Sequence, residues 1–186
     1  MAIRVISGKA KGRKLKMVPG DGSRPVMDRV KEALFNILAA EVPGSTWLDL
    51  FAGTGSIGIE ALSRGAKEAV FVDNSRQAIK TVHENLDHTR LSDNARVVRV
   101  DALDYLDRGP TRQFDLIYIA PPQYHGLWKK ALVKLDKKPD WLNPDGLVVV
   151  QIDPKEAETV SLNVLESYDE RTYGGTLLWF FERPGE

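Results

Sequence analysis

The run Trp47-Leu48-Asp49-Leu50-Phe51-Ala52-Gly53-Thr54-Gly55-Ser56-Ile57-Gly58 decides the fold of this chain. It predicts a buried strand that ends in an acid, followed by a glycine turn and the start of a helix. Gly53 and Gly55 let the backbone approach a ligand closely because they lack a side chain, and Gly58 lets the helix press against the strand. The Gly-x-Gly-x-x-Gly spacing fits a dinucleotide site, a nucleoside-methionine site, or a tight turn without a ligand.

Short apolar runs alternate with helical segments after this turn. We expect strands at 47–50, 69–73, 96–101, 114–119 and 146–152, and helices at 56–63, 75–86, 102–106 and 124–135. Such alternation predicts an α/β fold with a doubly wound, mainly parallel sheet. Two further strands, 164–168 and 176–182, are joined by Gly174-Gly175, which leaves no room for a helical crossover. One of them therefore runs antiparallel to its neighbour, in a sheet of seven strands.

The N-terminal part of the chain is basic. Residues 1–36 carry nine Lys or Arg and three acids, a net charge of +6, so the remainder of this neutral chain carries −6. Two β-prone runs, 3–7 and 13–18, flank a loop with a glycine at each end, which is typical of a β-hairpin. The next segment, 24–38, has the apolar spacing of an amphipathic helix. We divide the chain into a basic hairpin arm, 1–22, and a domain, 23–186.

The arm's cations favour contact with RNA. They are Arg4, Lys9, Lys11, Arg13, Lys14 and Lys16. Clustered cations on a protruding hairpin suit a phosphate backbone, because each contact releases condensed counterions. The alternative is an edge hairpin whose lysines only prevent aggregation.

Composition excludes several classes of site. The chain has no cysteine, and its three histidines lie far from any metal-ligand spacing, so we expect no metal. No apolar run reaches the roughly 18 residues needed to span a bilayer, and the N-terminus lacks the layout of a signal peptide. We therefore expect a cytoplasmic protein without a membrane partner.

The predicted strands end in residues that carry chemistry. Asp49, Asp73, Asp101 and the turn 120–122 follow four of them. Ligands of such sheets bind at the carboxyl ends of the strands. Each acid alone is also a common cap or turn residue. Asp73 lies about 20 residues beyond the glycine turn, where an acid holds ribose hydroxyls, which suits NAD and S-adenosylmethionine equally.

Three features favour S-adenosylmethionine. Asp49 opposes a pyrophosphate at the helix N-terminus but suits the cationic amine of a methionine. The antiparallel strand pair at the C-terminus is foreign to dehydrogenases. Pro121-Pro122 fixes the backbone and leaves rigid carbonyls that could hold an exocyclic amine.

These motifs resemble a known family. Asp49–Gly55 with Ala120-Pro121-Pro122 resembles the amino-methyltransferases of nucleic acids. The segments Arg4–Arg13 and Arg24–Asn36 make the chain similar to the bacterial RsmD family, which methylates guanine N2 in 16S ribosomal RNA. The resemblance covers nearly the whole chain. It implies a Rossmann-like methyltransferase fold, S-adenosylmethionine as cofactor, and 16S rRNA or the small ribosomal subunit as partner. We expect the protein to be a monomer.

The resemblance also implies roles for particular residues. Asp49–Gly55 would hold the methionine part of the cofactor, Asp73 the ribose, Asp101 with Ala102 the adenine, and Arg24 with Asp28 would close the pocket. The cofactor-binding set is Arg24, Asp28, Asp49, Phe51, Ala52, Gly53, Thr54, Gly55, Asp73, Asn74, Asp101 and Ala102. The catalytic turn is Ala120, Pro121, Pro122, Gln123 and Tyr124. We expect Tyr124 to stack on an extruded base and Trp128 to lie in the core.

Ala120 departs from the family pattern. The family's turn usually reads Asp or Asn, Pro, Pro, Tyr or Phe, and Ala120 cannot accept a hydrogen bond from the target amine. Correct positioning of the substrate and a hydrogen bond to the Pro121 carbonyl can sustain catalysis. Gln123, Tyr124 or His125 could replace part of the missing interaction. The alternative is a cofactor-binding ribosome-assembly factor whose chemistry is weakened. A DNA adenine-N6 methyltransferase is disfavoured because 186 residues leave no DNA-reading domain, and a dehydrogenase is opposed by Asp49.

Overall fold

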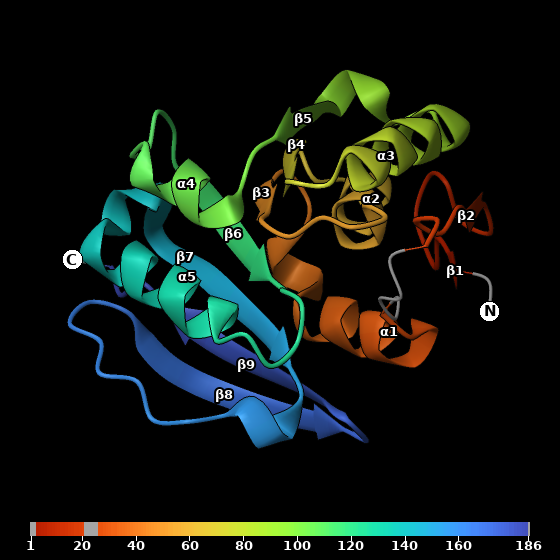
Figure 1. Ribbon diagram of the computed structural model, residues 1–186. Helices are drawn as coiled ribbons and strands as arrows, with labels where there is room; N and C mark the ends of the chain where they lie inside the picture. The colour runs from red at the N-terminus through yellow and green to blue at the C-terminus, as the bar shows by residue number, and fades with distance from the viewer. Residues whose placement is uncertain (1–2, 21–25, 186) are drawn as a thin grey trace.

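The apolar runs around the glycine turn form the centre of a seven-stranded sheet in the computed structural model, which describes residues 3–20 and 26–185. Its strands are β3 (Thr46–Asp49), β4 (Glu68–Asp73), β5 (Ala95–Arg99), β6 (Phe114–Ile119), β7 (Leu142–Ile152), β8 (Glu166–Tyr173) and β9 (Thr176–Glu182). Their order is β5-β4-β3-β6-β7-β9-β8, and Figure 1 shows the twisted sheet with its helices.

The chain reverses its direction across the sheet between β3 and β6. Strands β4 and β5 follow on one side of β3, and β6 and β7 on the other, all parallel to it. A ligand of such a sheet binds at the carboxyl ends of the strands on either side of this point. The expectation of a doubly wound, mainly parallel sheet is confirmed.

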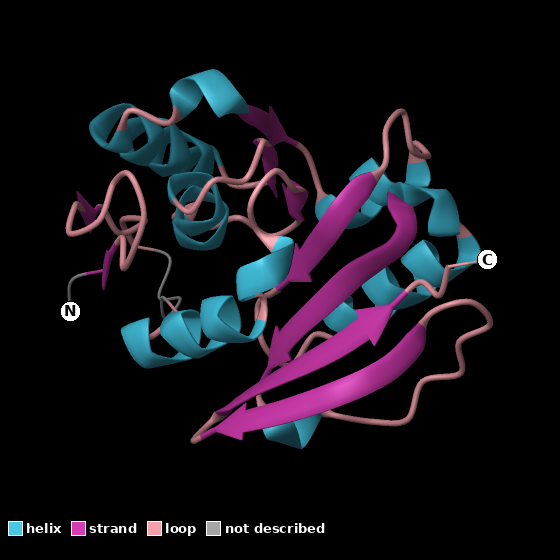
Figure 2. Ribbon diagram, turned by 180° about the vertical axis from the view of Figure 1, so that it is seen from behind, coloured by secondary structure: helices cyan, strands magenta, loops and turns pink. Residues whose placement is uncertain are grey.

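The C-terminal strands are antiparallel, as expected. β9 pairs antiparallel with β7, and β8 pairs antiparallel with β9 at the edge of the sheet, where Figure 2 shows the hairpin. The expected range of β8, 164–168, was too short, because pairing with β9 extends it to Tyr173. β7 begins before the expected residue 146, but residues 143–146 bulge away from β6 and the regular ladder resumes at Leu147.

Five α-helices within the described residues cover the two faces of the sheet. They are α1 (Asp28–Ile37), α2 (Ser56–Ser63), α3 (Arg76–Thr89), α4 (Ala102–Asp107) and α5 (Leu127–Lys137). One core cluster joins α1, α2 and α3 to one face, and a second joins α4 and α5 to the other. Short 3-10 turns lie at Ala39–Glu41, Ser92–Asn94, Pro139–Trp141 and Pro154–Glu156.

The start of α5 differs from the expectation, and the expected start of the first helix falls outside the described residues. The helix expected from 124 begins at Leu127 instead, because Tyr124 and Gly126 have φ angles of 65° and 64°, which an α-helix cannot contain. The expected start of the first helix, at Arg24, lies outside the described residues, and so does the boundary between arm and domain at 22 and 23. Trp128 is 1% exposed and is a core residue, as expected.

The arm is a short hairpin of β1 (Ile3–Arg4) and β2 (Lys14–Leu15). Its apolar side chains belong to the same core cluster as those of α1, α2 and α3. Gly8 permits a close approach, since a Cβ there would lie 1.9 Å from the Ser63 carbonyl oxygen of α2. The arm is therefore packed into the domain core through this face.

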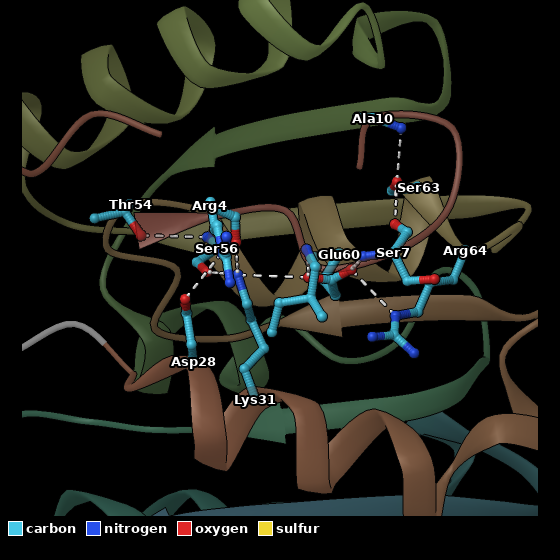
Figure 3. Close-up of polar contacts among 12 residues, drawn as sticks. Arg4, Ser7, Ala10, Asp28, Lys31, Thr54, Ser56, Glu60, Ser63 and Arg64 are labelled. Carbon is cyan, nitrogen blue, oxygen red and sulfur yellow. Dashed lines mark hydrogen bonds and ion pairs between the residues drawn. The ribbon is translucent and has the colours of Figure 1, made fainter. Parts of the chain in front are cut away.

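A buried ion pair between Lys31 of α1 and Glu60 of α2 holds the backbone of the arm in place, as Figure 3 shows. Lys31 of α1 is fully buried, lies 3.5 Å from Glu60 of α2, and donates to the Arg4 carbonyl at 2.5 Å and to Ser56 Oγ at 2.9 Å. Glu60 accepts the backbone N–H groups of residues 6 and 7 and is paired with Arg64. Burial lowers the pKa of Lys31, and the Glu60 charge opposes that shift.

Candidate active site

A cavity of about 890 Å³ opens at the carboxyl ends of β4, β3, β6 and β7. Of the predicted cofactor and amine-site residues that the structure describes, all except Asp28 and Gly55 line it. Arg24, the remaining one, lies outside the described residues. The parallel strands thus bring together predicted site residues that are spread over the sequence from Asp49 to Tyr124.

The glycine turn shapes one wall of the cavity. Gly53 has a φ of 55° with open space where a side chain would stand, and Gly55, with a φ of 81°, is the N-cap of α2. Both angles fall in the left-handed region that glycine adopts without strain. Gly58 allows close packing, because a Cβ there would lie 2.3 Å from the Phe71 ring. The helix therefore presses closely against Phe71 of β4 at this point, while the Gly58 N–H donates to Asp49 of β3.

Asp49 is a buried carboxylate whose negative charge is balanced by few hydrogen bonds. It is 2% exposed and accepts one backbone N–H, from Gly58, at 3.3 Å. Burial raises its pKa to about 7, the Gly58 bond opposes this, and the charge of Asp73 adds to it. A cation bound beside Asp49 would compensate the buried charge, so this corner of the cavity suits an ammonium group.

The other two acids hold the walls of the cavity. Asp73 accepts the N–H of Gly53 and the N–H of Ser75, both at 2.9 Å, and so ties the glycine turn to β4. Asp101 caps α4 by accepting the N–H groups of Leu103 and Asp104 through Oδ1. Each carboxylate oxygen has two lone pairs, so both acids keep acceptor capacity toward the cavity.

Tyr124 is held rigidly at the cavity mouth. Its side chain is 61% exposed, its hydroxyl donates to Asp153 at 2.5 Å, and its N–H donates to Glu156 at 2.8 Å. The hydrogen bond to Asp153 raises the pKa of Tyr124. An exposed ring fixed at both ends offers a ready surface on which a base can stack.

Two cavity residues escaped the sequence analysis. Tyr118 of β6 is buried and donates its hydroxyl hydrogen bond to Gln151 Oε1 of β7. Burial raises the pKa of Tyr118, and the charge of Asp49 raises it further. The only hint in the sequence is that each interrupts an otherwise apolar strand, as a polar group turned toward a site does.

Asn85 of α3, also missed, connects the arm to the glycine turn. It is 1% exposed; its Oδ1 accepts the Lys16 N–H at 2.7 Å, and its Nδ2 donates to the carbonyls of Lys16 and Thr54 at 3.1 and 2.9 Å. The next two residues of the chain, Met17 and Val18, line the cavity. The end of the arm is therefore part of the cavity wall.

The predicted RNA-binding cations fall into two groups. Arg4 pairs with Asp28 at 3.3 Å, Arg13 donates to the His88 carbonyl at 2.6 Å, and Lys16 pairs with Glu84 at 3.2 Å. Lys9, Lys11 and Lys14 are exposed, and none of the ion pairs found among residues 3–20 and 26–185 involves them. These three lysines are therefore the most available cations of the arm.

Two further kinds of feature, a membrane-spanning helix and a metal site, were sought among the described residues. No helix among them is long and apolar enough to cross a membrane. Within the same ranges, no group of three His, Asp or Glu side chains is arranged to hold a metal ion.

Comparison with known proteins adds the following findings. Residues 3–182 match the family model described as "Conserved hypothetical protein 95". The "Putative rRNA methyltransferase YlbH" of Bacillus subtilis is 40% identical over 185 residues, covering 98% of this chain and 100% of that protein. The "Ribosomal RNA small subunit methyltransferase D" of Escherichia coli strain K12 is 37% identical over 149 residues, covering 80% and 74%.

Solved structures share the fold. The "Putative methyltransferase yhhF" of Escherichia coli superposes with a TM-score of 0.86 at 31% identity, over 100% of both chains. An RNA methyltransferase of Salinibacter ruber, solved with S-adenosyl-L-homocysteine, shares the fold at 17% identity, with a TM-score of 0.67 over 88% of this chain and 95% of that one.

Proposed function

The chain belongs to the RsmD family, whose model is described as "Conserved hypothetical protein 95", and on this basis we propose that it transfers a methyl group from S-adenosylmethionine to N2 of a guanine in 16S rRNA. The buried, weakly compensated carboxylate of Asp49 at the floor of the cavity is the observation that carries this proposal.

The cavity suits S-adenosylmethionine along its length. Asp49 would receive the methionine ammonium, Asp73 the ribose hydroxyls, and Asp101 with Ala102 the adenine. The turn at Gly53 leaves open space beside them. When bound, the cofactor supplies a methyl group already activated by its sulfonium charge, so the protein's tasks are to position the acceptor and exclude water.

The opposite side of the cavity suits the target base. Pro121 and Pro122 follow β6 after Ala120 and present a rigid backbone to the cavity. Tyr124 stands at the mouth with its ring exposed. A guanine extruded from its helix would stack on Tyr124 and direct its exocyclic amine inward, as enzymes that act on bases require.

The arm supplies the sequence-independent part of RNA binding. Lys9, Lys11 and Lys14 are exposed on a hairpin whose final residues continue into the cavity wall. Phosphates bound by these lysines would therefore lie on the same side of the molecule as the wall formed by Met17 and Val18. Contacts of this kind position RNA without reading its sequence.

Methyl transfer to defined acceptors tests the proposal. Labelled S-adenosylmethionine is supplied with small ribosomal subunits from a strain lacking the methyltransferase, with naked 16S rRNA, and with DNA. We expect label on guanine N2 of the rRNA, identified by nucleoside analysis. Label on DNA adenine would instead support the DNA methyltransferase, and RNA binding with no transfer to any acceptor would support the assembly factor suggested by Ala120.

A further inference from the structure

The cavity must hold an amine at a place where the catalytic turn offers no side chain. Ala120 is partly buried against the core and has no polar atom to offer. A guanine amine has two N–H donors. Moving an N–H from water to a buried place without an acceptor costs about 1–3 kcal/mol. A rigid backbone carbonyl can accept one of them, so one further acceptor is needed near Ala120.

Strand register places Gln151 beside Ala120. The parallel ladder of β6 and β7 pairs Tyr118 with Val149 and Ile119 with Val150. The next residues are Ala120, directly after the end of β6, and Gln151 of β7. Since side chains alternate along a strand, those of Ala120 and Gln151 lie on the same face as Tyr118. Both line the cavity.

Tyr118 fixes the amide of Gln151. Its buried hydroxyl donates to Gln151 Oε1, and an amide oxygen has a second lone pair that can accept another donor. Tyr118 also pairs in register with Asp49 of β3. Gln151 lies two residues beyond Val149, the register partner of Tyr118 on β7. Asp49, Tyr118 and Gln151 thus follow a diagonal across three adjacent strands, with the expected cofactor ammonium at one end and an acceptor amide at the other.

The other polar groups of the turn are committed elsewhere. The Tyr124 hydroxyl is bonded to Asp153 and its N–H to Glu156. Gln123 and His125 are exposed at the mouth. Among residues 3–20 and 26–185, Gln151 is the one side-chain amide that is both partly buried within the cavity and oriented by a buried partner.

We infer that Gln151 accepts an N–H of the target amine and replaces the acceptor that Ala120 lacks, while Tyr118 is its positioning residue. This inference rests on the proposed function. In the transfer, the amine nitrogen forms a bond to the methyl carbon, the bond between that carbon and the cofactor sulfur breaks, and one amine proton passes to water. A bond to Gln151 directs the nitrogen lone pair toward the methyl group.

Substitution of Gln151 tests this role. Gln151→Leu keeps the side-chain size and should lower kcat about 10²–10³-fold, as loss of one preorganised hydrogen bond does. Its Kd for S-adenosylmethionine, measured by calorimetry without RNA, should stay within about twofold. Tyr118→Phe, which leaves the amide free to rotate, should lower kcat about tenfold. Gln77→Leu on the exposed face of α3 is the matched control and should behave as the wild type.

A rescue experiment separates an acceptor from a merely structural residue. In Gln151→Ala, a second change, Ala120→Asn, places an amide at the neighbouring position and should restore at least tenfold of the lost kcat. Turnover of Gln151→Leu within threefold of the wild type would overturn the inference and leave the proposed function intact. A cofactor Kd that weakens in step with kcat would also overturn it. A wild type that methylates no rRNA would overturn both proposals.

Discussion

At Asp49, the requirements of folding and of binding oppose each other. The carboxylate is buried with a single N–H partner at 3.3 Å, and its pKa is raised to about 7. A neutral carboxyl group would satisfy the folded chain, whereas an ammonium ligand needs the ionised form. The cost of ionising Asp49 is therefore met when the cation binds.

This opposition predicts a pH-dependent cofactor affinity. Above about pH 7, Asp49 is ionised before binding, and the Kd for S-adenosylmethionine should be constant. Below it, binding must release the proton, and the affinity should fall up to tenfold for each pH unit. Calorimetry from about pH 5.5 to about pH 8, on both sides of the Asp49 pKa of about 7, measures this. Asp49→Asn should bind at least about a hundredfold more weakly, with no such slope; a flat profile in the wild type would contradict the assignment.

Asp49 also predicts a change in folding stability with pH that is opposite in sign to the change in cofactor affinity. The folded pKa of Asp49 lies above its usual value of 3.8, so its favourable contribution is full below pH 4 and is lost as the pH rises through about 7. Asp49→Asn removes the buried charge. In the absence of cofactor, the variant should therefore be more stable than the wild type at pH 8, by up to roughly 4 kcal/mol. Urea unfolding at pH 5 and 8 measures this difference, which should shrink at pH 5.

At the scale of elements, the arm differs from an appended tail. Its apolar side chains share the core of α1, α2 and α3, and its backbone is bonded to Glu60, Ser63 and Asn85. The closest contact is at Gly8, where a Cβ would meet the Ser63 carbonyl at 1.9 Å. Gly12, at the other end of the loop, has a similar φ of 84° but nothing within 4 Å.

These two glycines form a matched pair for measuring the docking of the arm. Gly12→Ala incurs only the left-handed backbone penalty, about 1–2 kcal/mol. Gly8→Ala adds a steric clash with α2, and its total cost should reach about 2–5 kcal/mol. Urea unfolding of both variants gives the comparison. Equal costs would show that the arm does not press on α2 in solution.

The elements bounded by local turn signals were the easiest to predict. The ranges of α2, β6 and β9 match the expectation, because an apolar run between turn signals specifies them locally. The start of α5 was missed because Tyr124 adopts a φ that only its contacts to Asp153 and Glu156 explain. Contacts distant in the sequence leave no local signal.

For the whole molecule, charge is divided unevenly along the chain: residues 1–36 carry a net charge of +6, and residues 37–186 carry −6. The arm that carries the exposed lysines packs through its apolar side chains on the face covered by α1, α2 and α3. The sum of charges is zero, so any attraction for RNA depends on this separation rather than on net charge.

Removal of three arm lysines tests the direction of RNA approach. Changing Lys9, Lys11 and Lys14 to Ala should weaken binding of 16S rRNA and make the slope of log K against log salt shallower by about 2. The Kd for S-adenosylmethionine should not change. Lys67, Lys130 and Lys137 are exposed elsewhere, and replacing them removes the same charge. Filter binding across a salt series compares the two triple variants; equal slopes would place the RNA on another surface.

Much of the site could be read from the sequence, because parallel strands deliver their ends to one edge. Asp49, Asp73 and the turn at Pro121 meet at one cavity for this reason. Gln151 could not be found, because its role depends on the register between β6 and β7. Asn85 was missed for a similar reason, since a single asparagine within a helix gives no sign of the two loops that it joins.

The bond network of Asn85 bears on how such an enzyme could be redirected to another RNA. Asn85, Lys31 and Glu60 lie outside the arm and bind its main-chain N–H and C=O groups. An arm grafted from a relative should therefore dock on the same anchors, provided that its backbone follows the same path. Because Asn85 also donates to the Thr54 carbonyl, such an exchange should change the surface offered to RNA and leave the glycine turn in place.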